Sequence, residues 1–109
     1  MSVIANPHRG EVLLVIDGVP HLMRLTLGAL AGLETRLEAG SLMGLAERFE
    51  NGEVPTSDLI ALLAAGLAGA GSPITERQLA AADIEGGAVG AMRAGIELLS
   101  RAFRPFGDG

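Results

Sequence analysis

The side chains that most often bind metals or act as acid–base catalysts are scarce in this chain. It contains two histidines and no cysteine in 109 residues. The lack of cysteine excludes disulfides, zinc–thiolate sites and thiol nucleophiles. A predicted strand and turn separate His8 from His21, and no carboxylate lies at a spacing typical of metal sites. We interpret both histidines as surface residues and expect no metal, no cofactor and no enzymatic activity.

A glycine-rich segment over residues 66–71 has the composition, but not the position, of a phosphate-binding loop. Phosphate loops follow a strand and present backbone N–H groups at the start of a helix, and the P-loop version adds a lysine. Here the glycines close a predicted helix, and the chain contains no lysine. We therefore interpret them as helix termination and close packing.

The stretch Ser57-Asp58-Leu59 invites comparison with acyl carrier proteins, which are small and acidic. Those proteins carry a prosthetic group on a serine at a helix start, within Asp-Ser-Leu. Here the aspartate follows the serine, and a leading hairpin is foreign to that family. We interpret Thr56 and Ser57 as helix N-caps. A small carrier protein is the least favoured function.

Charge and hydropathy exclude two further classes of function. The net charge is −5, and the arginines are scattered from Arg9 to Arg104, whereas nucleic-acid binders cluster their basic residues. The longest uncharged stretch, residues 59–75, contains Pro73 and several glycines, and its helical part is shorter than the roughly 20 residues of a membrane span. No signal peptide is recognisable. We expect a soluble, cytoplasmic protein that binds neither nucleic acid nor membrane.

The first elements that would position a site form a β-hairpin. Residues 11–16 are rich in valine, leucine and isoleucine and predict a strand. Asp17-Gly18 is a hairpin-turn dipeptide, because glycine accepts the positive φ that tight turns need. The return strand is predicted over residues 21–25. Residues 1–8 and 104–109 show little pattern and are expected to be flexible.

Helical periodicity follows the hairpin. Thr26 is a predicted N-cap, and its helix is expected to stop at Gly40. Ser41 is predicted to cap a second helix that ends at Asn51-Gly52. The apolar stripe of the first helix is Leu27, Leu30, Leu33 and Leu37, and that of the second is Leu42, Leu45, Ala46 and Phe49.

Two further helices have clear start signals. Residues 55–58 open a helix that runs to about residue 70 and is apolar nearly all round, which indicates a buried central helix. Its expected core residues are Leu59, Ile60, Leu63 and Leu67. Thr75 and Gln78 form a capping box for a short helix that ends near residues 85–87. Together these patterns predict one α+β domain over residues 1–109, mainly helical, with an N-terminal β-hairpin packed on about five helices.

The last predicted helix, residues 88–103, holds the candidate partner-binding residues. Five apolar residues recur three and four apart along it: Val89, Met92, Ile96, Leu99 and Phe103. This seam either packs on the chain's own core or also receives a partner helix. Leu98 lies off the seam, so we expect it either to pack peripherally or to contact the partner.

The opening of the chain has a distinctive run of residues, Asn6, Pro7, His8, Arg9, Gly10 and Glu11, followed by an apolar strand, Asp17-Gly18 and Arg24. This opening resembles a phage tail-assembly family that is represented in gene transfer agents. Leu30 and Leu33-Glu34, the stretch from Ser41 to Phe49, Asp58-Leu59 and the glycine-rich segment extend the resemblance over residues 5–103. Leu25-Thr26-Leu27 stands where related sequences often have Pro-Thr-Phe.

The resemblance implies a role among tail proteins under one of two labels, tail assembly chaperone or tail tube protein. A chaperone would hold the tape-measure protein soluble until tube subunits polymerise around it, and would be absent from the finished particle. A tube subunit is usually mostly β-structure, whereas a helical, acidic chain favours the chaperone. The implied partner is the tape-measure protein. The tail tube protein as a second partner and self-association are left open.

Overall fold

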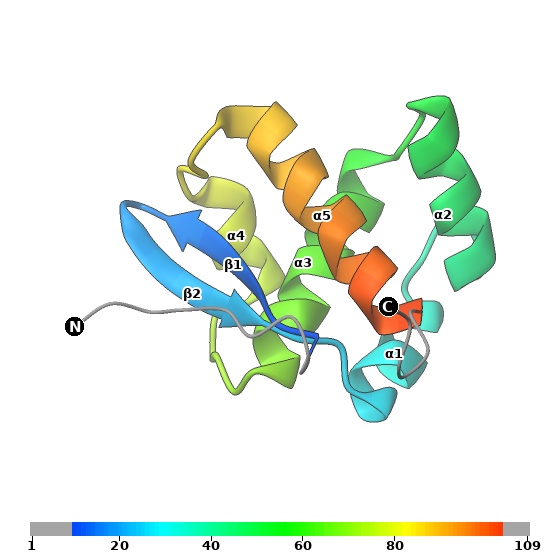
Figure 1. Ribbon diagram of the computed structural model, residues 1–109, viewed down its shortest axis with the longest axis horizontal. Helices are drawn as coiled ribbons and strands as arrows, with labels where there is room; N and C mark the ends of the chain where they lie inside the picture. The colour runs from blue at the N-terminus through cyan, green and yellow to red at the C-terminus, as the bar shows by residue number, and fades with distance from the viewer. Residues whose placement is uncertain (1–9, 104–109) are drawn as a thin grey trace.

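The computed structural model describes residues 10–103, which form a two-stranded hairpin and five helices (Figure 1). The elements are, in order, β1 (Val12–Ile16), β2 (Val19–Met23), α1 (Leu27–Glu34), α2 (Leu42–Asn51), α3 (Thr56–Gly69), α4 (Glu76–Ala81) and α5 (Gly87–Phe103). The predicted α+β fold, with an N-terminal hairpin packed on five helices, is confirmed. The expected flexibility of residues 1–8 and 104–109 lies outside the described residues.

A two-residue turn sets the register of the hairpin. Asp17 and Gly18 have φ of 51° and 80°, so Ile16 pairs directly with Val19. β2 therefore begins at Val19, two residues earlier than the sequence predicted, because the residues on either side of a two-residue turn pair directly with each other. Pro20 lies opposite Val15, at a position that does not need an N–H group for the ladder.

A third backbone segment joins the free edge of β1. The Asp17 amide donates to the Asp83 carbonyl at 2.8 Å, and the Glu85 amide donates to the Val15 carbonyl at 3.1 Å. Ile84 forms an antiparallel bridge with Ile16 between these bonds. α4 was predicted to continue to residues 85–87 but ends at Ala81, because the residues after it pair with β1 instead.

The first two helices begin as predicted, but the first ends early. The hydroxyl of Thr26 accepts from the Ala29 amide at 3.0 Å, and that of Ser41 accepts from the Gly44 amide at 2.9 Å. α1 stops at Glu34, well before Gly40, and Leu37 is buried from within the following loop. The predicted stripe is therefore broken: Leu27, at its other end, is 86% exposed.

Asp58 holds the loop that replaces the end of the predicted first helix. Its carboxylate is buried at the first turn of α3 and accepts from the amides of Glu38 and Ala39 at 2.8 and 3.0 Å. The predicted capping role of Thr56 and Ser57 is wrong. α3 follows Pro55 without a side-chain capping bond, and both residues are exposed.

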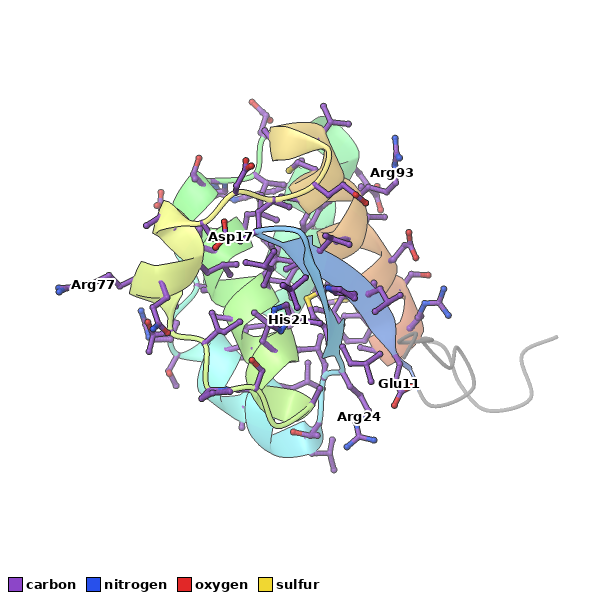
Figure 2. All side chains as sticks on the ribbon, turned by 90° about the vertical axis from the view of Figure 1, so that its left-hand side faces the viewer. Glu11, Asp17, His21, Arg24, Arg77 and Arg93 are labelled. Carbon is purple, nitrogen blue, oxygen red and sulfur yellow. The ribbon has the colours of Figure 1, made fainter. Side chains whose placement is uncertain are left out.

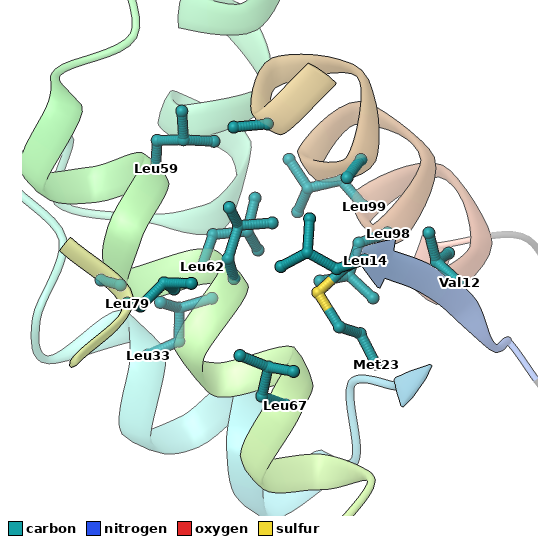
Figure 3. Packing of buried hydrophobic residues seen from close by; sticks show 14 of the residues in the cluster. Val12, Leu14, Met23, Leu33, Leu59, Leu62, Leu67, Leu79, Leu98 and Leu99 are labelled. Carbon is teal, nitrogen blue, oxygen red and sulfur yellow. The ribbon is translucent and has the colours of Figure 1, made fainter. Parts of the chain in front are cut away.

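α3 is the central helix and contacts β2, α1, α4 and α5, whereas α2 packs against α5 (Figure 1). Leu59, Leu63 and Leu67 are buried as predicted, whereas Ile60 is half-buried. Figure 3 shows side chains of the hairpin, α3 and α5 converging on one hydrophobic core. The capping box of α4 is confirmed, since Thr75 and Gln78 each bind the other's backbone amide.

Candidate partner-binding surface

The structure divides the candidate residues of α5 between surface and core. Val89, Ile96 and Phe103 are 66%, 48% and 48% exposed, whereas Leu98 is fully buried and Leu99 nearly so. The alternative in which the whole seam packs on the chain's own core is therefore wrong, because these three residues are exposed. The alternative that Leu98 is an exposed partner contact is also wrong, because no part of its side chain reaches the surface.

The true core face of α5 is built largely from small residues. It consists of Ala91, Ala94, Gly95, Leu98 and Leu99. A Cβ on Gly95 would lie 3.0 Å from the Phe49 ring and 3.1 Å from a methyl group of Leu59. These small residues let α5 approach α2 and α3 closely, which turns the larger apolar residues on its other side toward solvent.

An apolar groove separates α5 from α2 near the end of α5. Its volume is about 310 Å³, and its lining residues are Ala46, Phe49, Glu50, Ile96, Leu99, Ser100 and Phe103. Leu99 and the half-buried Phe49 form part of the apolar lining, and the exposed Ile96 and Phe103 belong to the same lining. Glu50 is the charged residue of the lining. Such a surface suits an apolar helix better than a polar small molecule.

The remaining candidates lie elsewhere. Met92 is half-buried and lines a different hollow, of about 390 Å³, together with Leu79 and Ile84. Val89 is exposed but lines neither this hollow nor the groove. The structure thus brings Ile96, Leu99 and Phe103 together and leaves Val89, Met92 and Leu98 outside the groove. Partner binding by any of these residues other than the buried Leu98 stays a prediction.

The α2 side of the groove was missed by the sequence reasoning. Ala46 and Phe49 were assigned to a core-facing stripe, and both are half-buried. Their spacing does not predict a groove beside them, because an apolar helix face has the same residue spacing whether it is buried in the core or open to solvent. Only the separation between α2 and α5 reveals it.

The segments that resembled ligand sites have structural roles here. A Cβ on Gly66 would lie 2.6 Å from a methyl group of Leu98, and one on Gly69 would overlap the Arg24 carbonyl oxygen. The interpretation of the glycine-rich segment as helix end and close packing is therefore confirmed. Residues 10–103 contain no cluster of three side chains suited to a metal ion, and His21 lies half-buried on the hairpin.

The family motif is only partly described by the structure. Gly10 adopts a left-handed conformation, with φ of 73°, and Glu11 follows it at the start of the hairpin. Asn6, Pro7 and Arg9 lie outside the described residues. Within residues 10–103, no helix has the length and apolar character needed to cross a membrane.

Comparison with known proteins gives one family match. The family model described as "Phage tail tube protein, GTA-gp10" matches residues 9–105. Searches of curated proteins and of solved structures found no match. The matched range includes the hairpin, all five helices and the whole α2–α5 groove. The chain therefore belongs to the GTA-gp10 family of phage tail proteins.

Proposed function

We propose that this protein is a tail assembly chaperone that holds an apolar helical segment of the tape-measure protein in the groove between α2 and α5. The observation that carries the proposal is the exposure of Ile96 and Phe103 beside an apolar groove. Apolar grooves flanked by exposed large side chains are typical of surfaces that bind amphipathic helices. The role is non-enzymatic and exercised in the cytoplasm.

The arrangement of the groove supports a helical partner. Two helices of this chain form its walls, so a third helix laid between them would complete a three-helix packing unit. Ser100 and Glu50 offer polar groups among the lining, where the polar side of such a helix would emerge. Before the tube subunits polymerise, the apolar helical surface of a tape-measure protein must be shielded from water. Burial of one such segment in this groove would provide that shielding.

The rival function is a structural tail tube subunit, which the family's description names. Tube subunits usually close rings through paired strands. Here residues 10–103 contribute one two-stranded hairpin, and its β1 edge is partly occupied by residues 83–85. This topology favours the chaperone. A small carrier protein remains the least favoured reading, and the intact mass of the protein from its native host tests for a group on Ser57.

The test is co-purification of the full chain with the tape-measure protein after co-expression. Ile96→Glu and Phe103→Glu should stay folded and reduce recovery of the partner at least about tenfold, because a carboxylate would be buried against an apolar helix. Val89→Glu is the matched control, since Val89 is exposed on the same helix but outside the groove. Thermal melts verify that each variant folds.

Two results would decide against the proposal. Recovery of the partner at wild-type level by both groove variants would remove the groove from the interaction. Failure of the wild type to bind the tape-measure protein, together with its presence in purified particles, would favour the structural subunit.

A further inference from the structure

The α2–α5 groove adjoins a second apolar hollow along the same helix. This hollow, of about 390 Å³, is lined by residues of α3, α4 and the first turns of α5. Met92 lines the hollow, and Ile96, one turn further along α5, lines the groove. Between them lies Gly95, where an added Cβ would be 3.0 Å from Phe49 of the groove and 3.1 Å from Leu59 of the hollow. The groove and the hollow therefore meet where α5 packs against these two side chains.

Together the groove and the hollow form one apolar track along α5. Its two ends on this helix are Ala88, in the hollow, and Phe103, in the groove, and both residues are exposed. At 1.5 Å per residue they are separated by about 22 Å. The facing wall runs in the opposite direction, since Phe49 of α2 lines the groove and Val54, beyond the end of α2, lines the hollow. A helix laid along the track would need about 15 residues to reach both ends.

The charged residues that line the track are acids. Glu50 lines the groove and Asp83 lines the hollow, and both are exposed. Among the residues that the structure describes, neither carboxylate forms an ion pair or a hydrogen bond. Arg48 and Arg93 are sequence neighbours of lining residues but line neither half of the track. Both halves therefore offer an unpaired negative charge beside an apolar surface, which is complementary to an apolar segment with basic residues at its margins.

We propose that one amphipathic helix of the partner occupies the whole apolar track, and that arginine or lysine residues border its apolar face. The inference rests on the proposed function, because it takes the groove as part of the same binding site. Apolar side chains three and four apart along the partner helix would contact the groove at one end and the hollow at the other. A segment confined to the groove would leave the hollow open to water and Asp83 without a partner.

Photo-crosslinking of the full chain, co-expressed with the tape-measure protein, tests the extent of the contact. A photoreactive phenylalanine analogue replaces Ala88, Phe103 or Val89 in separate preparations. The analogues at residues 88 and 103 should each crosslink to the tape-measure protein, at sites about 15 residues apart within one segment as located by mass spectrometry. The analogue at residue 89 should crosslink little, because Val89 is exposed on the same helix but lines neither half of the track.

A substitution in the hollow tests its contribution to binding. Ala88→Arg should lower recovery of the tape-measure protein at least about tenfold, because it places a charge in an apolar contact and repels the basic margin of the partner. Val89→Arg is the matched control, since it adds the same charge to the adjacent exposed residue, outside the track. Thermal melts verify that both variants fold.

Charge reversal tests the basic margins of the partner. Asp83→Arg and Glu50→Arg should each lower recovery roughly threefold at low salt, and added sodium chloride should lower recovery by the wild type. Asp83→Arg should stay folded, because the bonds of this residue to Asp17 use its backbone atoms. Glu34→Arg is the control, since Glu34 is exposed on α1 and lines neither half of the track.

The outcomes separate this inference from the proposed function. Crosslinking from residue 103 but not from residue 88 would confine the partner to the groove, which overturns the inference and leaves the proposed function intact. Crosslinking from neither residue would remove both. Equal recovery by Ala88→Arg and Val89→Arg would exclude the hollow, and wild-type recovery by both acid variants would exclude the basic margins.

Discussion

The side chain of Leu98 on α5 packs directly over Gly66 on α3, where a Cβ would lie only 2.6 Å from a leucine methyl group. Leu98 is fully buried, and Met23 of the hairpin packs against the same glycine. This one contact ties together α3, α5 and the hairpin, as Figure 3 shows for Leu98 and Met23. It also fixes which side of α5 faces the core.

Shortening Leu98 should therefore destabilise the whole domain. We expect Leu98→Ala to lower the free energy of unfolding by about 2–5 kcal/mol, the usual range for a buried leucine. Ile96→Ala, two residues away but half-exposed, should change it by less than about 0.5 kcal/mol. Urea denaturation of both variants measures the difference. Equal losses would mean that α5 is rotated relative to this structure.

A methyl group at Gly69 should be poorly tolerated. The Cβ would overlap the carbonyl oxygen of Arg24, which is backbone and cannot move without shifting β2. We expect Gly69→Ala to cost about 1–3 kcal/mol through overpacking. Gly32→Ala on α1 is the control, because nothing lies within 4 Å of its added Cβ, and it should stabilise by about 0.5–1 kcal/mol. A stabilising Gly69→Ala in thermal melts would contradict the close approach.

Removal of the Asp58 carboxylate should release the loop between α1 and α2. Asp58→Ala leaves the amides of Glu38 and Ala39 without their acceptor, at an expected cost of about 1–3 kcal/mol. Asp58→Asn retains one acceptor oxygen and should lose less. Hydrogen exchange at the two amides should accelerate in Asp58→Ala while Ser57→Ala leaves it unchanged, since Ser57 is exposed and makes no capping bond. Unchanged exchange in Asp58→Ala would show that another group holds the loop.

The contribution of the α4 capping box to the free energy of unfolding should be measurable with a single substitution. Thr75→Ala removes the hydroxyl that accepts from the Gln78 amide at 3.1 Å, and should cost about 1 kcal/mol. Thr56→Ala at the start of α3 should cost little, because α3 begins without a side-chain cap. Comparison of the two alanine variants by chemical denaturation checks the assignment. A larger loss at Thr56 would restore the capping role that the sequence suggested there.

The sequence predicted the α5 side of the candidate site but not the α2 side. The spacing of Ile96, Leu99 and Phe103 marks them as neighbours on one helix, and the structure places all three in the groove. The contribution of Phe49 to the other wall was not visible, because it depends on how α2 lies beside α5. The sequence also left open which face of α5 packs on the core, because apolar side chains occur on more than one of its faces.

The sequence by itself determined the features that depend on a few adjacent residues. The tight turn at Asp17-Gly18, the cap at Thr26 and the box at Thr75 and Gln78 arise from local φ preferences and local hydrogen bonds. Only the tertiary structure decided where α1 and α4 end, because the segments that follow them donate backbone hydrogen bonds to the carboxylates of the distant Asp58 and Asp17. It also decided which face of α5 is buried, because small residues contribute little to a hydrophobic pattern but permit the closest helix contact.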